Sequence, residues 1–372
     1  MSEMIGGYEV KEPLSNKNAG FSKWGFGEKD GKTWFLKEFL SPVYPVNRGE
    51  MTEKSMQRKL TQCHEYEIDK IRLFSQLGRA SDGNLLRIHE FFRYGSKYYI
   101  ATEAVTGKTF QDAVQLPEEK KILVLKILAH SMASLHQAGL VHGDIKPDNL
   151  IFRETKNGNI SAKIIDIDGC FSVSAPPTDP DSMNGDQLYL APETFQFILE
   201  QPVKLTEKID VFAMGLVFFQ LLTGDMPAFP SDDYKYPFSV LLDGKALDLS
   251  AVKNETLQEI IAGMLAADPV HRTSMQQVYE TLSAAWPVKT ARVSTGPVDW
   301  TRTESYEDAQ RRLRRMGSFP PGAGPVDPRA AAYAGSLGGS GALKGRMGPA
   351  RSAPGAGAAE DTDEFFSAAG DL

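Results

Sequence analysis

The sequence has little cysteine, no long apolar run and no long basic block. Its 372 residues include only Cys63 and Cys170, which provide no disulfide framework and favour a reducing compartment. The longest apolar run, Val211 to Leu222, is broken by Gly215 and Gln220 and is too short to span a bilayer. A formal net charge of −7 gives nucleic-acid binding little support. We therefore expect neither a nucleic-acid partner nor a membrane segment.

The start of the chain also lacks the features of a signal peptide. MSEMIGGYEVKEP has neither a charged beginning nor an apolar centre. Residues are 41% hydrophobic and 24% charged overall, enough for the cores of one large or two moderate domains. These features predict a globular, cytoplasmic protein.

Two kinds of periodicity divide the chain. Short aromatic or alternating segments with turn signals between them fill the first hundred residues: YEVKEPL, GFSKWGFGE, KTWFLKEFL, LLRIHEFFRYG and KYYIATEAV. Helical spacing occurs in Met51 to Leu77 and, later, in Ile122 to Gln137, Asp210 to Thr223, Thr256 to Ala266 and Ser274 to Ala285. We expect an α+β fold of two lobes, with an N-terminal tail at 1–7, a small β-rich N-lobe at about 8–103 and a larger helical C-lobe at about 107–287.

Composition changes after Trp286. Residues 320–359 are mostly Gly, Ala, Pro, Arg and Ser, which bury too little surface to offset chain entropy, so residues 288–372 are predicted to be a disordered tail. Within it, RRLRRMGSF places Arg315 three residues before Ser318, a pattern of basic-directed phosphorylation sites. EDTDEFF at the end is a candidate docking peptide for a partner protein.

One polar loop contains residue types suited to phosphoryl transfer. That chemistry needs cations at the phosphates, oxygen ligands for Mg²⁺ and a carboxylate at the acceptor hydroxyl. In VHGDIKPDNL, Asp144 would take the acceptor's proton, Lys146 would contact the γ-phosphate and Asn149 would offer an amide oxygen to the metal. An ordinary polar turn is the alternative.

Further residues of the same kind occur in a suitable order. KIIDIDG places Asp166 at the end of an apolar strand, where it would bind Mg²⁺ beside Asn149. WFLKEF places Lys37 on a strand, as a clamp for the α- and β-phosphates requires. These residues together make an isolated polar turn a poor explanation.

A lysine in that role needs a carboxylate that holds it in place. The helix after Lys37 offers Glu65 and Glu67 in HEYEIDKI. We predict Glu67, because Ile68 and Ile71 behind it would anchor the helix to the lobe. Glu65 remains open.

From about Tyr8 to Pro287 the sequence resembles the eukaryotic-like Ser/Thr protein kinase family. LYLAPE (Leu188 to Glu193) is similar to the segment that closes the family's activation loop. DVFAMG (Asp210 to Gly215) is similar to the start of the helix that follows. DPVHRT (Asp268 to Thr273) is similar to the segment whose arginine, here Arg272, pairs with Glu193.

The resemblance implies a two-lobed fold with ATP and Mg²⁺ in the cleft and a protein substrate. ATEAVTG resembles the adenine-binding hinge, with Thr102 at the gatekeeper position and Glu103 and Val105 as the binding residues. The family's glycine-rich turn would fall near residues 15–21, where NKNAGF offers only Gly20. Lys146, two residues after Asp144, implies Ser/Thr acceptors, and the tail itself is one candidate substrate.

The sequence departs from the family's pattern at several places. Gly143 replaces the arginine that often precedes the catalytic aspartate, so we expect activity without activation-loop phosphorylation. Asp168 replaces a flexible glycine; a solvated or backbone-capping role is expected rather than metal binding. Phe35 would narrow or reshape the adenine pocket, and Asp186 would either pair with Lys146 or repel Asp144.

Two other functions remain open at this point. The irregular glycine turn, Phe35 and Asp186 are compatible with a pseudokinase that binds nucleotide or partner proteins. His-Gly-Asp at residues 142–144 is also typical of kinase-like small-molecule phosphotransferases. Such enzymes generally lack the segment of Glu193 and its arginine partner.

Overall fold

The computed structural model describes residues 2–287, except residues 17–21, 48, 50, 82, 156, 157, 181, 182, 184 and 231. Gly20 and the predicted tail at 288–372 lie outside the described residues. Among the residues within this range, no helix is both long and apolar enough to cross a membrane.

The N-lobe is built on one antiparallel sheet with the strand order β1-β2-β3-β4-β6-β5. Its strands are β1 (Glu3–Ile5), β2 (Tyr8–Val10), β3 (Ser22–Lys29), β4 (Lys32–Phe39), β5 (Ile88–Tyr94) and β6 (Lys97–Glu103). On one face of this sheet, buried residues form an apolar cluster: Ile5, Tyr8, Val10, Leu36, Tyr99 and Ala101. The predicted β-rich lobe is confirmed.

The predicted N-terminal tail at 1–7 is wrong, because residues 3–5 form the first strand of the sheet. Ile5 pairs with Tyr8 across a two-residue turn, Gly6-Gly7, in which both glycines have positive φ. Such a pair favours the tight turn of a β-hairpin. Ile5 is buried, and its side chain joins the core of the sheet.

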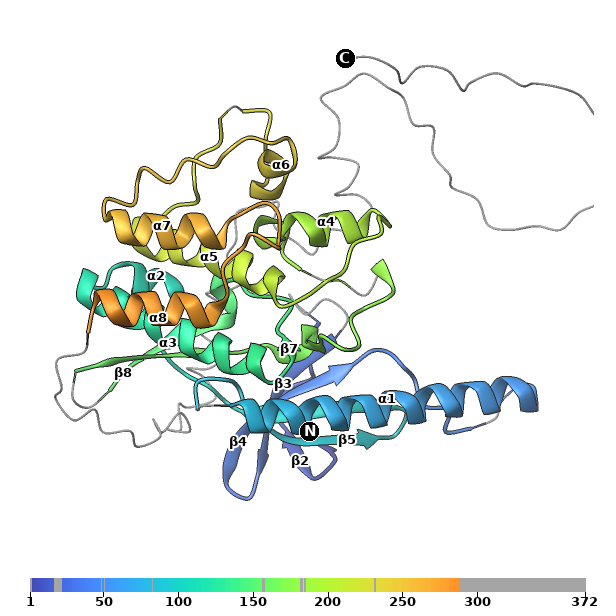
Figure 1. Cartoon of the computed structure of the whole chain (residues 1–372). Helices are drawn as coiled ribbons and strands as arrows, with labels where there is room; N and C mark the ends of the chain where they lie inside the picture. Colours follow the sequence, from blue (N-terminus) through green and yellow to red (C-terminus); the bar gives the residue numbers. More distant parts are fainter. Residues whose placement is uncertain are drawn as a thin grey trace, which may run out of the picture. The chain divides into compact units, whose positions relative to one another are not determined.

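Helix α1 (Glu53–Ala80) begins at the N-cap Thr52 and is 28 residues long. In Figure 1 its first turns project past the strands, while its later turns lie against the sheet. Cys63, Tyr66 and Phe74 pack there with Phe39 and Tyr98. The sequence predicted instead that the face with Ile68 and Ile71 would anchor the helix to the lobe.

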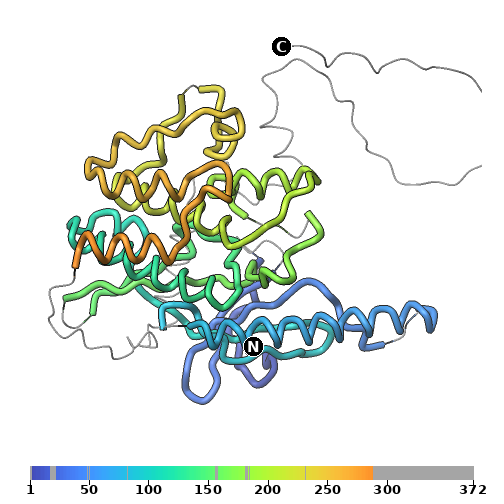
Figure 2. The backbone as a smooth tube through the Cα atoms, in the orientation of Figure 1, coloured from blue at the N-terminus to red at the C-terminus, as the bar shows by residue number. Residues whose placement is uncertain are grey.

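The C-lobe is mainly helical, as predicted (Figures 1 and 2). Its α-helices are α2 (Phe110–Val114), α3 (Glu118–Gln137), α4 (Pro192–Ile198), α5 (Lys208–Thr223), α6 (Pro237–Leu242), α7 (Glu255–Met264) and α8 (Met275–Ala285). Helix α5 is apolar on every side and is buried along most of its length. It therefore provides a rigid centre for the loops around it.

Short strands and 3₁₀ turns carry the polar segments of the C-lobe. The pairs are β7 (Leu140–Val141) with β10 (Phe171–Ser172), and β8 (Leu150–Glu154) with β9 (Ile160–Ile164). The 3₁₀ turns are η1 (Pro147–Asn149), η2 (Ile167–Gly169) and η4 (Gln187–Tyr189). The loop before β8 and the turn after β9 are thereby held next to each other.

Candidate active site

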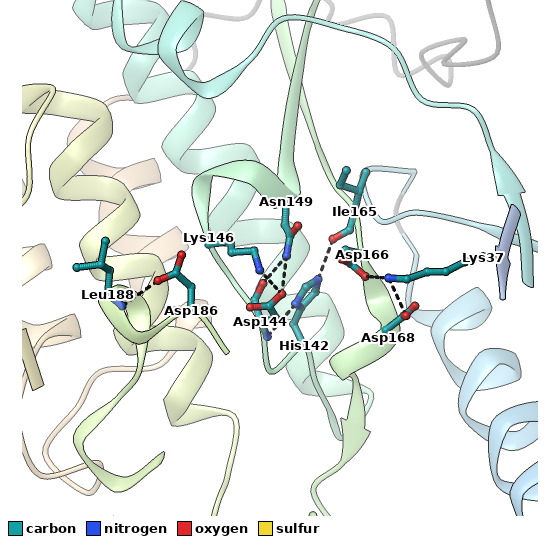
Figure 3. A network of polar contacts seen from close by, with 10 residues as sticks. All are labelled: Lys37, His142, Asp144, Lys146, Asn149, Ile165, Asp166, Asp168, Asp186 and Leu188. Atoms are coloured by element: carbon teal, nitrogen blue, oxygen red, sulfur yellow. Dashed lines mark hydrogen bonds and ion pairs between the residues drawn. The ribbon is translucent and has the colours of Figure 1, made fainter. Parts of the chain in front are cut away.

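The loop between β7 and β8 brings three predicted residues together (Figure 3). The carboxylate of Asp144 accepts a hydrogen bond from Lys146 Nζ at 2.7 Å and another from Asn149 Nδ2 at 3.0 Å. Asn149 Nδ2 also donates to the backbone oxygen of Asp144 at 2.7 Å. The loop therefore fixes a carboxylate, an ammonium group and an amide in one place.

Burial and charge shift the pKa values of Asp144 and Lys146. Burial raises the pKa of Asp144, and the attraction of Lys146 only partly opposes that shift. For Lys146, burial acts to lower the pKa, but Asp144 outweighs it and the pKa is raised. A carboxylate with a raised pKa is a better proton acceptor than an ordinary aspartate at neutral pH.

Asp210, at the start of α5, holds the backbone of the same loop. Its carboxylate accepts hydrogen bonds from the backbone N–H of His142 at 2.7 Å and from that of Gly143 at 2.9 Å. It also lies 3.0 Å from His136 Nε2. Sequence reasoning placed Asp210 only at a helix start, although an acidic residue inside an apolar helix signals a buried acceptor.

His142 has a structural role. Its side chain is buried, Nε2 lies 3.2 Å from the backbone oxygen of Ile165, and Nδ1 accepts a hydrogen bond from the N–H of Asp144 at 3.3 Å. The imidazole therefore ties the Asp144 loop to the chain just before Asp166.

Asp166 follows β9 at the position expected from the sequence. Its φ of 60° is left-handed, a conformation that costs a non-glycine residue about 1 kcal/mol or more. The carboxylate Oδ1 accepts a hydrogen bond from Lys37 Nζ at 2.8 Å. Ile167, the next residue, is buried in the C-lobe core and anchors the turn.

The ligand types near Asp166 suit Mg²⁺. The side-chain hydrogen bonds of Asn149 described above use its nitrogen, which leaves the amide oxygen for a cation, and Asp166 adds a partly exposed carboxylate. No cluster of three or more His, Cys, Asp or Glu suited to a metal occurs in the described part of the chain. Mg²⁺ does not require one, because it is usually bound by one or two protein oxygens together with water and phosphate.

The structure corrects the predicted partner of Lys37. Lys37 Nζ lies 2.8 Å from Asp166 Oδ1 and 2.7 Å from Asp168 Oδ2 (Figure 3). Glu67 Oε1 instead accepts a hydrogen bond from the hydroxyl of Tyr98 at 2.7 Å. The basis of the prediction was also wrong, because Ile68 and Ile71 are 41% and 59% exposed. Glu65 is exposed as well.

Asp168 is not the solvated or capping residue that the sequence predicted. Its side chain is 24% exposed, and its carboxylate forms an ion pair with Lys37. Burial raises the pKa of Asp168, while Lys37 opposes that shift. For Asp166, the same lysine outweighs burial and the pKa is lowered.

The end of β6 and the segment after it join the two lobes. Thr102 is buried, and the carboxylate of Glu103 forms an ion pair with Lys163, which is almost fully buried on β9. Val105 is also buried, and a Cβ atom on Gly107 would clash with the backbone oxygen of Phe152. Sequence reasoning missed the contribution of Lys163 to fixing this segment.

Aromatic residues lie beside Lys37 on its face of the sheet. Phe35, two residues before Lys37 on β4, stacks on Trp24 at 6.1 Å and meets the edge of Phe26 at 5.7 Å between ring centroids. Because strand side chains alternate, Phe35 and Lys37 share one face. Phe35 therefore belongs to a packed aromatic layer.

Asp186 has a partner that the sequence did not predict. Its Oδ1 accepts a hydrogen bond from the backbone N–H of Leu188 at 3.0 Å and so caps η4. Lys146 pairs with Asp144 instead. Burial, together with the charges of Asp186 and Asp144, raises the pKa of nearby Asp148 to about 6.

The predicted pair between Arg272 and Glu193 is formed and buried. Arg272 donates to the two carboxylate oxygens of Glu193 at 2.6 and 3.1 Å. Its remaining N–H groups reach the backbone oxygens of Ala266, Ala267 and Lys208. Charges removed from water in this way need such complete pairing.

Comparisons with known proteins find a matching family and several similar relatives. The family described as "Protein kinase domain" matches residues 49–282. A probable myosin light chain kinase of Dictyostelium discoideum is 26% identical over 204 residues, which are 53% of this chain and 64% of the relative. The serine/threonine-protein kinase PrkC of Bacillus subtilis is 29% identical over 199 residues, 51% of this chain and 29% of PrkC.

A third relative matches over a longer stretch. Aurora kinase A-B of Xenopus laevis is 24% identical over 280 residues, 70% of this chain and 64% of the relative. The matches span less than two thirds of the length of each of these three relatives.

Proposed function

Because this chain belongs to the protein kinase family, we propose that it transfers the γ-phosphoryl group of ATP to serine or threonine hydroxyls of protein substrates, with Mg²⁺ as the metal. The observation that carries the proposal is the convergence of Asp144, Lys146 and Asn149 in one loop. Beside that loop lies the pair of Asp166 and Lys37.

The nucleotide would be bound from both lobes. Glu103 and Val105 would meet the adenine through their backbone groups, and Lys37 would contact the α- and β-phosphates. Gly20 is proposed for the phosphate turn. Asn149 and Asp166 would hold Mg²⁺, which would neutralise the charge that develops on the phosphates.

In the transfer step, Asp144 would accept the proton of the acceptor hydroxyl. Its carboxylate would orient the acceptor hydroxyl and take its proton as the hydroxyl oxygen bonds to the γ-phosphorus, while the bond from that phosphorus to the bridging oxygen breaks and ADP leaves. Lys146, 2.7 Å from Asp144, would hold that carboxylate and neutralise charge on the transferred group. The raised pKa of Asp144 favours the proton transfer.

Three observations favour a protein kinase over the alternatives. One of the relatives named above, PrkC, is a serine/threonine-protein kinase. The buried pair of Glu193 and Arg272 is present, a feature that small-molecule phosphotransferases of this kind generally lack. Asp186 also leaves the pair of Lys146 and Asp144 intact.

Phosphoamino-acid analysis tests the substrate class and the metal together. The full chain would be incubated with γ-labelled ATP and a generic basic protein, with Mg²⁺ or with a chelator. We expect labelled phosphoserine or phosphothreonine that requires Mg²⁺. Asp166→Asn should lose this label, and Asp69→Asn, a change of an exposed carboxylate on α1, is its matched control and should keep it. Label on tyrosine, or equal transfer with chelator, would overturn this assignment.

A further inference from the structure

Lys37 is held by two carboxylates of one turn. Asp166 and Asp168 lie on either side of its ammonium group, at 2.8 and 2.7 Å (Figure 3). In protein kinases the corresponding lysine is held by a glutamate of the N-lobe helix. Here the helix provides no such carboxylate, and the turn that contains the metal-binding Asp166 provides two.

The packing of α1 fixes which of its side chains face the site. Cys63 is 1% exposed, and Glu67 is hydrogen-bonded to Tyr98. One turn after Tyr66, the ammonium group of Lys70 lies over three aromatic rings, with 5.6, 5.9 and 5.6 Å to the centroids of Phe39, Tyr66 and Phe74. To bring Glu67 to Lys37, α1 would have to disrupt these contacts.

The charge of α1 complements Asp168. Burial lowers the pKa of Lys70, and the carboxylate of Asp168 acts against that shift. The site therefore combines Asp166 and Asp168 with two cations, Lys37 on β4 and Lys70 on α1. A glutamate on this face would add a third negative charge to the same place.

We propose that Asp168 is the positioning residue for Lys37, in place of a glutamate from helix α1. The proposal rests on the kinase function proposed above. It follows that the conformation of the turn after β9, and not the rotation of α1, determines whether Lys37 is aimed at the nucleotide phosphates.

The first test needs neither nucleotide nor metal. Mass spectrometry measures how fast acetic anhydride acylates Lys37 in the folded protein. Because only the neutral amine reacts, this rate reports how strongly the ammonium form of Lys37 is stabilised. Asp168→Asn should raise this rate about tenfold, as loss of one pKa unit would. Glu67→Gln and the surface control Asp69→Asn should stay within twofold. Asp168→Ser is the substitute if Asp168→Asn fails to fold.

A charge relocation separates positioning from a structural role. In the double variant Asp168→Asn with Lys70→Glu, the carboxylate moves from the turn to α1. Slow acylation of Lys37 should return, and kcat/KM for ATP should recover most of a loss of about tenfold that Asp168→Asn causes. The proposal would be overturned if Asp168→Asn left the acylation rate of Lys37 unchanged, or if Glu67→Gln raised that rate instead. It would also be overturned if the double variant failed to recover slow acylation. If the wild type transfers no phosphate, the proposed function fails, and the acylation series still decides the role of Asp168.

Discussion

A Cβ atom on Gly143 would lie 2.7 Å from the backbone oxygen of Gly169, and Gly143 itself has a φ of +81°. The catalytic loop and the turn after Asp166 therefore approach so closely that only glycine fits at residue 143. The arginine that many kinases have here is excluded by this backbone arrangement. Gly143→Ala should destabilise the protein by about 2 kcal/mol or more, through the left-handed φ and the steric clash.

Gly139→Ala separates the two contributions. Gly139 also has a positive φ, of +72°, but no heavy atom lies within 4 Å of its added Cβ. This variant should lose only about 1 kcal/mol. Urea denaturation compares both variants with the wild type. Equal losses would contradict the proposed clash between the two loops.

The buried pair of Arg272 and Glu193 should be essential for the C-lobe. Arg272→Ala leaves the carboxylate of Glu193 buried without its partner, and removal of one member of such a pair costs about 3–5 kcal/mol. Thermal unfolding measures the loss. Substitution of Lys108, a half-exposed cation paired with Glu154, is the control and should cost well under 1 kcal/mol. A similar small loss in Arg272→Ala would contradict the assigned role.

Glu90 should stabilise the N-lobe in a pH-dependent way. Its Oε2 accepts hydrogen bonds from Tyr8 at 2.8 Å and from Lys29 at 2.9 Å. Burial acts to raise the pKa of Glu90, but these partners outweigh it and the folded pKa lies below the ordinary value of 4.5. The contribution is therefore present above pH 4.5 and is lost as pH falls through the folded pKa.

Glu90→Gln tests this dependence. At pH 7 the variant should be less stable than the wild type by about 1 kcal/mol, since the pair is partly exposed and screened by water. At pH 3 the difference should shrink, because this pH lies below the ordinary pKa of 4.5, where the unfolded chain already binds the proton. Denaturant titrations at both pH values measure it, and a difference that does not depend on pH would count against the ion pair.

The long helices could be predicted because their periodicity is local. The pattern from Ile122 to Gln137 falls within α3, and that from Asp210 to Thr223 falls within α5. The short helices α2 and α6 escaped prediction, since five or six residues contain too few turns for a period to show.

The inward face of α1 could not be predicted from its own residues. Ile68 and Ile71 form one apolar stripe and Tyr66 and Phe74 another, so the helix has two candidate faces. The aromatic cluster around Tyr98 selects the second. Glu67 was assigned to Lys37 on the basis of the first stripe, whereas the observed partners, Asp166 and Asp168, lie 129 and 131 residues away along the chain. Which residues pair over such a distance depends on the packing of the folded chain, and no local sequence pattern contains that information.

The most direct test of the account is the rate of labelled phosphate transfer at saturating ATP and Mg²⁺, compared between the wild type and Asp144→Asn. Thermal stability and nucleotide binding of both proteins are measured in parallel. We predict transfer by the wild type and a loss of about 10²–10⁴-fold in the variant, with nucleotide still bound. Wild-type protein that binds nucleotide without transfer, or equal transfer by a folded Asp144→Asn variant, would contradict the assignment of Asp144 and its loop as the catalytic centre.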